Sequence, residues 1–152
     1  MRITTWTEYS LIIALHLAKR GASGAGPVAA REIAENERLP GDYVEQILLR
    51  LRRAGLVESV RGAKGGYFLA KEPANISMRD IMTASEHQTF EMNCESHPVD
   101  PERCRPGAGC TIRPVWFALQ QRVDELLSSI SLADLLKEET QVQELVSIAP
   151  AT

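Results

Sequence analysis

Apolar residues recur at helical spacing through the first third of the chain, and they predict three helices. The first helix is expected to begin at a capping box formed by Thr5 and Glu8 and to end before Gly21. The second is predicted for residues 29–37 and the third for residues 43–54, on the two sides of a Leu-Pro-Gly break. Two helices joined by such a break are typical of a helix-turn-helix. The inward apolar positions are Leu11, Ile12, Leu15, Ala18, Ile33, Ala34, Tyr43, Ile47, Leu48 and Leu51.

Two short runs of strand-forming residues follow the third helix at once. They cover residues 55–60 and 67–69, and the segment 61–66 between them is basic and rich in glycine. This pattern predicts a β-hairpin with a cationic tip. A helical pair followed directly by such a hairpin is the element order of a winged helix-turn-helix. The expected fold class is therefore mainly α, with a two-stranded wing.

A regular apolar repeat near the C-terminus predicts a last long helix that begins at Pro114. Its apolar positions are spaced alternately by three and four residues, which is typical of a helix that packs against a partner helix. We therefore expect a C-terminal dimerisation helix and a homodimer. Cap spacings at Ser77 and Ser131 predict shorter helices before and after it, ending near Ala84 and Leu136. The members of the repeat are Trp116, Leu119, Val123, Leu126 and Ile130.

Charge is distributed unevenly along the chain, although the net charge is only -3. Residues 50–66 carry five cationic side chains against one carboxylate, whereas residues 124–144 carry six carboxylates against one lysine. One end of the molecule is thus suited to face phosphate groups. A recognition helix presents polar groups to base edges and cations to phosphates. We therefore predict double-stranded DNA as a partner, contacted by Asp42, Tyr43, Glu45, Gln46, Arg50, Arg52, Arg53, Arg61 and Lys64.

Two copies of this DNA-reading head in a homodimer predict a roughly palindromic operator. The alternative interpretation is a basic helix face that is merely solvated, with Tyr43 in the core. The longest apolar stretch, residues 11–15, is far too short to cross a bilayer, so we expect no membrane partner. No secretory signal is visible at the N-terminus, and the expected location is the cytoplasm.

The chain of 152 residues is long enough for one core with an appendage. We expect it to be organised in four parts. These are a winged helix-turn-helix DNA-binding domain at 1–72, a connecting helix and cysteine-containing loop at 73–112, the dimerisation helix and a short terminal helix at 113–146, and a tail at 147–152.

Three cysteines, Cys94, Cys104 and Cys110, lie in a segment that has no periodicity and several prolines and glycines. In a reducing cytoplasm, clustered cysteines indicate metal or redox chemistry. Their thiolates would suit an iron–sulfur cluster or zinc. Three free thiols that act as small apolar residues are a further alternative. The candidates for a fourth ligand are His87, His97 and Glu8.

Several runs of the sequence together resemble the IscR, NsrR and RirA group of bacterial winged-helix regulators. The runs are MRIT at 1–4, YVEQIL at 43–48, LRRAGLV at 51–57, VRGAKGGY at 60–67 and ISLADL at 130–135. The resemblance spans nearly the whole chain. It implies a homodimer that carries a 2Fe-2S or 4Fe-4S cluster on three cysteines per subunit. The positions matching those ligands are Cys94, Cys104 and Cys110.

The fourth ligand differs among members of this group. IscR-like members have a histidine three residues after the last cysteine, where this chain has Arg113. NsrR-like members use a carboxylate from the partner subunit near the start of the first helix, and Glu8 matches that position. The nine residues between the first two cysteines exceed the common spacings of the group. This difference bears on the geometry of the loop but not on the set of cysteine ligands. Glu8 is thus either a ligand from the partner subunit or the closing residue of the Thr5 capping box.

The resulting hypothesis is a DNA-binding transcriptional regulator, a repressor or an activator, that senses redox, iron or nitric oxide status through its cluster. Loss, oxidation or nitrosylation of the cluster would shift the first helix and move the two recognition helices relative to their half-sites. A zinc-bound or thiol-based redox repressor without a cluster is the main alternative. A small thiol redox enzyme is less favoured, because no cysteine is predicted at a helix N-terminus beside a base.

Overall fold

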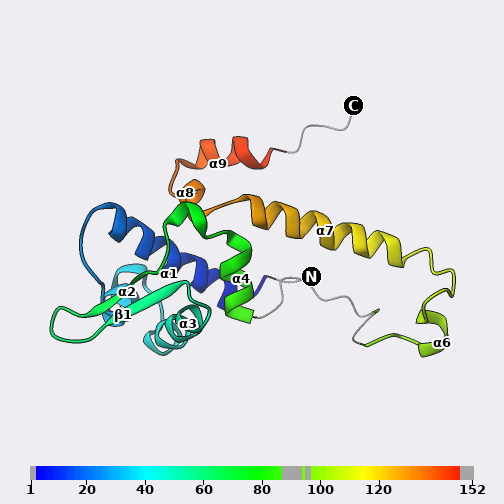
Figure 1. The fold of residues 1–152 in the computed structure, drawn as a ribbon, viewed down its shortest axis with the longest axis horizontal. Helices are drawn as coiled ribbons and strands as arrows, with labels where there is room; N and C mark the ends of the chain where they lie inside the picture. The colour runs from blue at the N-terminus through cyan, green and yellow to red at the C-terminus, as the bar shows by residue number, and fades with distance from the viewer. Residues whose placement is uncertain (1–2, 87–93, 95–96, 148–152) are drawn as a thin grey trace.

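A computed structural model of the chain describes residues 3–86, 94 and 97–147. A winged-helix head is formed by the N-terminal elements, and α7 extends away from it (Figure 1). The elements in chain order are α1 (Thr5–Ala22), α2 (Ala30–Glu37), α3 (Gly41–Arg53), β1 (Val57–Val60), β2 (Gly66–Leu69), the 3-10 helix η1 (Pro73–Asn75), α4 (Met78–Glu86), α6 (Pro101–Cys104), α7 (Arg113–Ser129), α8 (Leu132–Leu135) and α9 (Glu139–Val146).

The core of the head lies between α1 and α3. The inward face of α1 and that of α3 are fully buried against each other and against α4. Arg38, which follows α2, adopts a left-handed conformation with φ of 56°, and Leu39 then donates to the Ala34 carbonyl at 2.9 Å. This turn sends the chain directly into α3, so the predicted helix-turn-helix is confirmed. The residues of the interlocking faces are Ile13, Ala14, Leu17 and Ala18 on α1 and Val44, Ile47, Leu48 and Leu51 on α3.

The predicted two-stranded wing is also confirmed. Strands β1 and β2 pair antiparallel from Val57 opposite Leu69 to Val60 opposite Gly66, and Val28 adds an isolated bridge to Tyr67. Gly66 has a φ of +152°, and a Cβ there would lie 2.4 Å from the Val28 carbonyl carbon. The close approach of the bridging segment therefore requires glycine at this position.

The C-terminal helices return to the head beside α4. Met78 donates to the Ile130 carbonyl at 2.9 Å, and Leu132 donates to the Ile76 carbonyl at 2.8 Å. Leu132 is fully buried, so α8 forms part of the same core. Ile130 is buried as well, although the sequence pattern places it on the dimerisation stripe.

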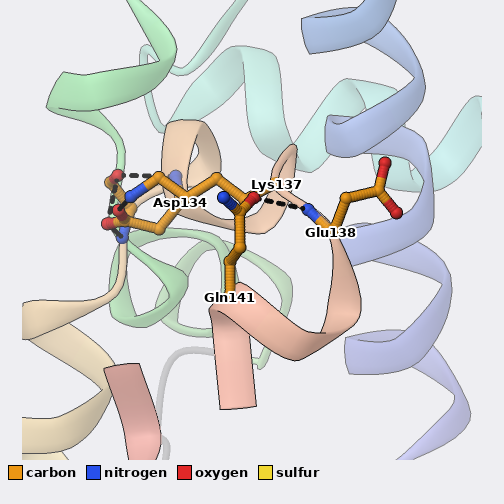
Figure 2. Close-up of polar contacts among 5 residues, drawn as sticks. Asp134, Lys137, Glu138 and Gln141 are labelled. Atoms are coloured by element: carbon orange, nitrogen blue, oxygen red, sulfur yellow. Dashed lines mark hydrogen bonds and ion pairs between the residues drawn. The ribbon is translucent and has the colours of Figure 1, made fainter. Parts of the chain in front are cut away.

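Capping boxes begin α4 and α8 as the sequence predicts. Ser131 and Asp134 exchange backbone and side-chain hydrogen bonds, and Ser77 and Asp80 form the same arrangement. Figure 2 shows the neighbourhood of Asp134, which accepts a hydrogen bond from the Lys137 ammonium at 2.7 Å. It also shows α9, which begins where the Glu138 N–H donates to the Gln141 side chain.

The structure differs from the sequence predictions at three helices, α1, α6 and α9. The N-cap of α1 is Thr4 rather than Thr5, because the Thr4 hydroxyl accepts from the Thr7 N–H and donates to the Glu86 carboxylate. A short helix, α6, begins at an Asp100 cap inside the segment that was expected to be irregular. Helix α9 was not predicted at all. None of the helices in the described ranges is long and apolar enough to cross a membrane.

Candidate DNA interface and sensor site

The outward face of α3 carries most of the side chains that the sequence predicts for DNA recognition. Because four apolar residues of α3 face the core, the positions between them face solvent. Leu49 lies on the same face and is 44% exposed. The sequence gives no signal for this role, because an isolated leucine is usually a core residue, yet an exposed apolar group there suits contact with a thymine methyl. The exposed predicted residues of this face are Asp42, Glu45, Gln46, Arg52 and Arg53.

Tyr43 has a mixed position. Its ring lies 5.0 Å from that of Trp6 and makes an edge contact with Tyr9 at 5.7 Å, while 38% of the residue stays exposed. This aromatic cluster fixes the first turn of α3 against the start of α1. Tyr43 is therefore a packing residue through its ring contacts and a surface residue through its exposed part.

Arg50 differs from the other predicted DNA contacts. Its guanidinium carbon lies 4.3 Å from the centre of the Trp6 ring, and its Nη1 donates to the Ser85 carbonyl at the end of α4. The side chain is partly buried between three helices. By contrast, Arg52 and Arg53 are exposed and have no ion-pair partner among the residues that the structure describes.

The tip of the wing presents two more cations. Arg61 and Lys64 are exposed, and neither has an ion-pair partner in the described part of the chain. A Cβ at Gly65 would lie 2.2 Å from the Val60 carbonyl oxygen, so the tight turn that holds these cations requires glycine there. The wing is therefore shaped to bring cations close to a sugar-phosphate backbone.

The three cysteines line one pocket of about 610 Å³. All three are free and partly buried. Within the described residues, however, no group of three or more His, Cys, Asp or Glu side chains is arranged to hold a metal ion. The structure thus brings the thiols to a common pocket without forming a complete ligand set. The other residues of the pocket are Val99, Asp100, Arg103, Ile112 and Trp116.

Arg113 contacts two of the cysteines at the start of α7. Its guanidinium donates to the Cys104 carbonyl. Its backbone N–H, together with that of Ile112, donates to Cys110 and lowers the pKa of that thiol. Cys110 therefore lies two residues before Ile112, the N-cap of α7, where backbone N–H groups reach its sulfur. The sequence alone shows Arg113 only as a replaced histidine.

The candidate fourth ligands are not part of this pocket. Glu8 is exposed in the first turn of α1, and its carboxylate has no partner among the described residues. Because Thr4 caps this helix, Glu8 does not close a Thr5 capping box. His97 is exposed, and His87 lies outside the described residues. Within one chain, Glu8 is therefore free for another contact.

Helix α7 presents a broad apolar surface that the described part of this chain does not cover. None of its residues is buried. The predicted stripe is confirmed as a surface from Trp116 to Leu126, where it ends because Ile130 turns into the head. An ion pair of 3.3 Å between Arg79 and Asp124 ties α7 to α4. The exposed large apolar residues of α7 are Val115, Trp116, Phe117, Leu119 and Leu126.

Comparisons with known proteins agree over nearly the full length of the chain. Residues 3–138 match the Rrf2 family, described as iron-dependent transcriptional regulators. IscR of Xenorhabdus nematophila, an HTH-type transcriptional regulator, is 33% identical over 149 residues, which cover 98% of this chain and 85% of that protein.

Two solved structures are similar in fold. IscR of T. potens has a TM-score of 0.69 at 33% identity, covering 98% of this chain and 93% of that one. CymR, the global cysteine regulator of B. subtilis, has a TM-score of 0.69 at 35% identity, covering 89% and 95%. The chain is thus similar both to an IscR and to a cysteine regulator.

Proposed function

The chain belongs to the Rrf2 family of iron-dependent transcriptional regulators, and we propose that it binds its operator as a homodimer and senses redox, iron or nitric oxide status through an iron–sulfur cluster. It is a DNA-binding transcriptional regulator and not an enzyme. The observation that carries the sensing proposal is the single pocket shared by Cys94, Cys104 and Cys110. We place its action in the cytoplasm.

The DNA contacts divide between α3 and the wing. Gln46 is suited to pair with adenine and Glu45 to accept from cytosine N4, because both lie on the exposed face of α3. Leu49 lies one helical turn further along the same exposed face and would supply an apolar contact. The phosphate contacts come from exposed cations on both elements, which set the register but carry no sequence information. These cations are Arg52, Arg53, Arg61 and Lys64.

The donor set of the pocket fits an iron–sulfur cluster in its chemistry. Three soft thiols face one space, and Arg103 and Arg113 lie beside it to offset the negative charge of a thiolate-bound cluster. Ile112 and Trp116 supply an apolar wall. The cluster, of either the 2Fe-2S or the 4Fe-4S type, would supply a redox- and nitric-oxide-sensitive centre held by these cysteines.

Glu8 of the partner subunit is the proposed fourth ligand. In one chain Glu8 is exposed and unpaired among the described residues, and it does not line the cysteine pocket. The exposed apolar face of α7 supplies the dimer contact that this arrangement requires. A homodimer of two such heads would read a roughly palindromic operator.

The switch would operate through α1. Glu8 would be released if the cysteines no longer held an intact cluster, and the start of α1 would then be free to shift against α3. Misplaced base contacts would weaken operator binding by several kcal/mol, since each good bidentate contact contributes roughly 1–3 kcal/mol.

The test begins with anaerobic purification. We expect brown protein with thiolate-to-iron absorption and stoichiometric iron and sulfide, and a Cys104→Ala variant that has lost both. Operator affinity should then differ between the anaerobic and the air-exposed wild type. A normal cluster in Cys104→Ala would overturn the ligand assignment, and equal affinities would overturn the switch.

A thiol-based sensor is the second candidate, and one observation favours it. Backbone hydrogen bonds from Arg113 and Ile112 hold the pKa of Cys110 below its usual value, which raises its reactivity as a thiolate. The similarity to the cysteine regulator CymR fits this alternative. Colourless, iron-free protein whose operator affinity still changes on thiol oxidation would establish it. Stoichiometric zinc in such protein would indicate the zinc-bound form instead.

A further inference from the structure

Arg50 joins the recognition helix to the start of α1 and to the end of α4. It belongs to α3, its guanidinium packs on Trp6 in the first turn of α1, and it donates to the carbonyl of Ser85 in the last turn of α4. We propose that Arg50 is a positioning residue that transmits the state of the sensor to the recognition helix, and that it does not bind phosphate.

The geometry of the guanidinium separates Arg50 from the phosphate contacts. A guanidinium that packs on an aromatic ring and donates to a backbone carbonyl is held in one orientation by these two contacts. On α3, Arg50 lies on the side that faces α1 and α4, whereas Arg52 and Arg53 are exposed. A phosphate approaching the outward face of α3 would therefore meet these two side chains and not Arg50.

The contacts around Arg50 continue to the start of α1. Glu86, the residue after Ser85, accepts hydrogen bonds through its carboxylate from the hydroxyls of Thr4 and Thr7. These threonines belong to the same helix start as Glu8. The end of α4, the start of α1 and the last turns of α3 thus form one connected cluster, which we call the Arg50 cluster.

The place of this cluster in the chain gives it a role in signalling. Helix α4 ends at Glu86, and the segment that follows leads to Cys94, the first of the three cysteines. Glu8 lies on the other side of the same cluster. Any displacement of Glu8 or of the end of α4 therefore reaches α3 through the contacts of Arg50. This transmission role rests on the cluster-sensing function proposed above, whereas the positioning role rests only on DNA binding.

The salt dependence of operator binding tests the positioning role. Each arginine that contacts phosphate contributes about one to the slope of log affinity against log salt concentration, so its removal from both subunits lowers the slope by about two. We expect this decrease for the matched control Arg53→Gln. For Arg50→Gln we expect weaker binding with an unchanged slope. A slope that falls as in Arg53→Gln would overturn the positioning role.

The transmission role is tested by comparing operator affinity with and without the cluster. If wild type shows a ratio of at least about tenfold, a size typical of coupled sites, Arg53→Gln should keep that ratio and Arg50→Gln should reduce it to near one. An Arg50→Gln protein that keeps the wild-type ratio overturns the transmission role alone. A wild type with a ratio of one overturns the cluster switch and with it the transmission role, while the salt result still decides the positioning role.

A second variant covers the case in which Arg50→Gln does not fold, as judged by circular dichroism. Trp6→Phe keeps an aromatic ring against Tyr43 but weakens the cation–π contact, because indole is the strongest partner of a cation. It should reduce the affinity ratio at an unchanged salt slope. Retention of the full ratio in Trp6→Phe would then overturn the transmission role.

Discussion

Arg113 shows how a residue that resembles a lost ligand can acquire another role in the same site. In the sequence it stands where IscR-like proteins have a histidine, so it reads as a missing ligand. In the structure its guanidinium holds the Cys104 carbonyl and its backbone N–H contacts Cys110. Arg113 therefore contacts two of the proposed cysteine ligands, and hydrogen bonds to metal ligands are known to orient them.

Replacement of Arg113 by alanine should weaken retention of the proposed cluster without removing a proposed ligand. Outer-shell partners typically contribute about 10- to 100-fold to metal affinity, so we expect iron transfer to a chelator to be faster by at least about tenfold in Arg113→Ala. The measurement is the loss of thiolate-to-iron absorption under anaerobic conditions. Arg105→Ala is the matched control, because Arg105 is exposed and, within the described part of the chain, its side chain pairs only with Glu102 at 3.6 Å. Equal rates in both variants would contradict this role of Arg113.

At the scale of elements, the sequence predicts helix starts that depend on local caps. It does not predict a helix start that depends on a contact with a distant part of the chain. The boxes at Ser77 and Ser131 are closed by residues three positions later and were predictable. The start of α1 was not, because the Thr4 hydroxyl is held by Glu86, which lies 82 residues away in sequence. Helix α9 was missed because it is exposed and has few inward apolar residues to give a period.

The cysteine site was predictable to a similar extent. The residue types and the irregular composition of the segment identified Cys94, Cys104 and Cys110 as candidates. Their common pocket and the contacts of Arg113 depend on where α7 begins relative to α6, which no local pattern specifies. In the same way, the basic character of α3 was visible, but the inward direction of Arg50 depends on Trp6 and α4.

The cap of α8 should give the protein a pH-dependent stability. The Lys137 ammonium, with the Ser131 hydroxyl and N–H, holds the pKa of Asp134 well below its ordinary value of 3.8. A carboxyl with a depressed folded pKa stabilises the folded state above its unfolded pKa and loses this effect as pH falls through the folded value. Asp134→Asn should therefore lower the melting temperature at pH 7, and the difference from wild type should shrink progressively below pH 3.8.

Thermal melts followed by circular dichroism between pH 7 and pH 2 would test this. Glu144→Gln removes an exposed carboxylate of α9 and is the matched control, for which we expect no such convergence. A constant difference in melting temperature between wild type and Asp134→Asn over this range would show that the charge of Asp134 does not contribute to stability.

At the scale of the whole molecule, α7 is the element through which a second chain is expected to bind. It extends away from the head (Figure 1). The described residues leave its apolar surface exposed, and Ile112 and Trp116 at its start line the cysteine pocket. A large exposed apolar patch of this kind marks an interaction surface. The same contact that buries α7 would bring a second chain to the sensor, so dimerisation and cluster binding are expected to depend on each other.

Charges introduced on the α7 stripe should therefore separate the subunits. Leu119→Glu combined with Leu126→Glu places two carboxylates where an apolar partner is expected. We expect a monomer in sedimentation analysis and a loss of about 100-fold or more in operator affinity, because two linked heads gain roughly 10²- to 10⁴-fold over one. Ser128→Glu, on the side of α7 that shares a pocket with Arg79 of α4 and not on the stripe of Leu119 and Leu126, is the control and should remain dimeric. A dimeric double variant would exclude this face as the interface.

Mixed dimers distinguish a ligand from the partner subunit from one in the same chain. Glu8→Ala and Cys104→Ala homodimers should each lack a complete site. In a heterodimer purified through two different tags, the intact cysteines of the Glu8→Ala chain can meet the intact Glu8 of the Cys104→Ala chain. If Glu8 acts across the dimer, this heterodimer recovers one cluster and about half the iron of wild type, because one of its two sites is complete. If Glu8 acts within its own chain, neither site is complete and no iron returns. Because Glu8 in the described chain is exposed and outside the cysteine pocket, we expect recovery.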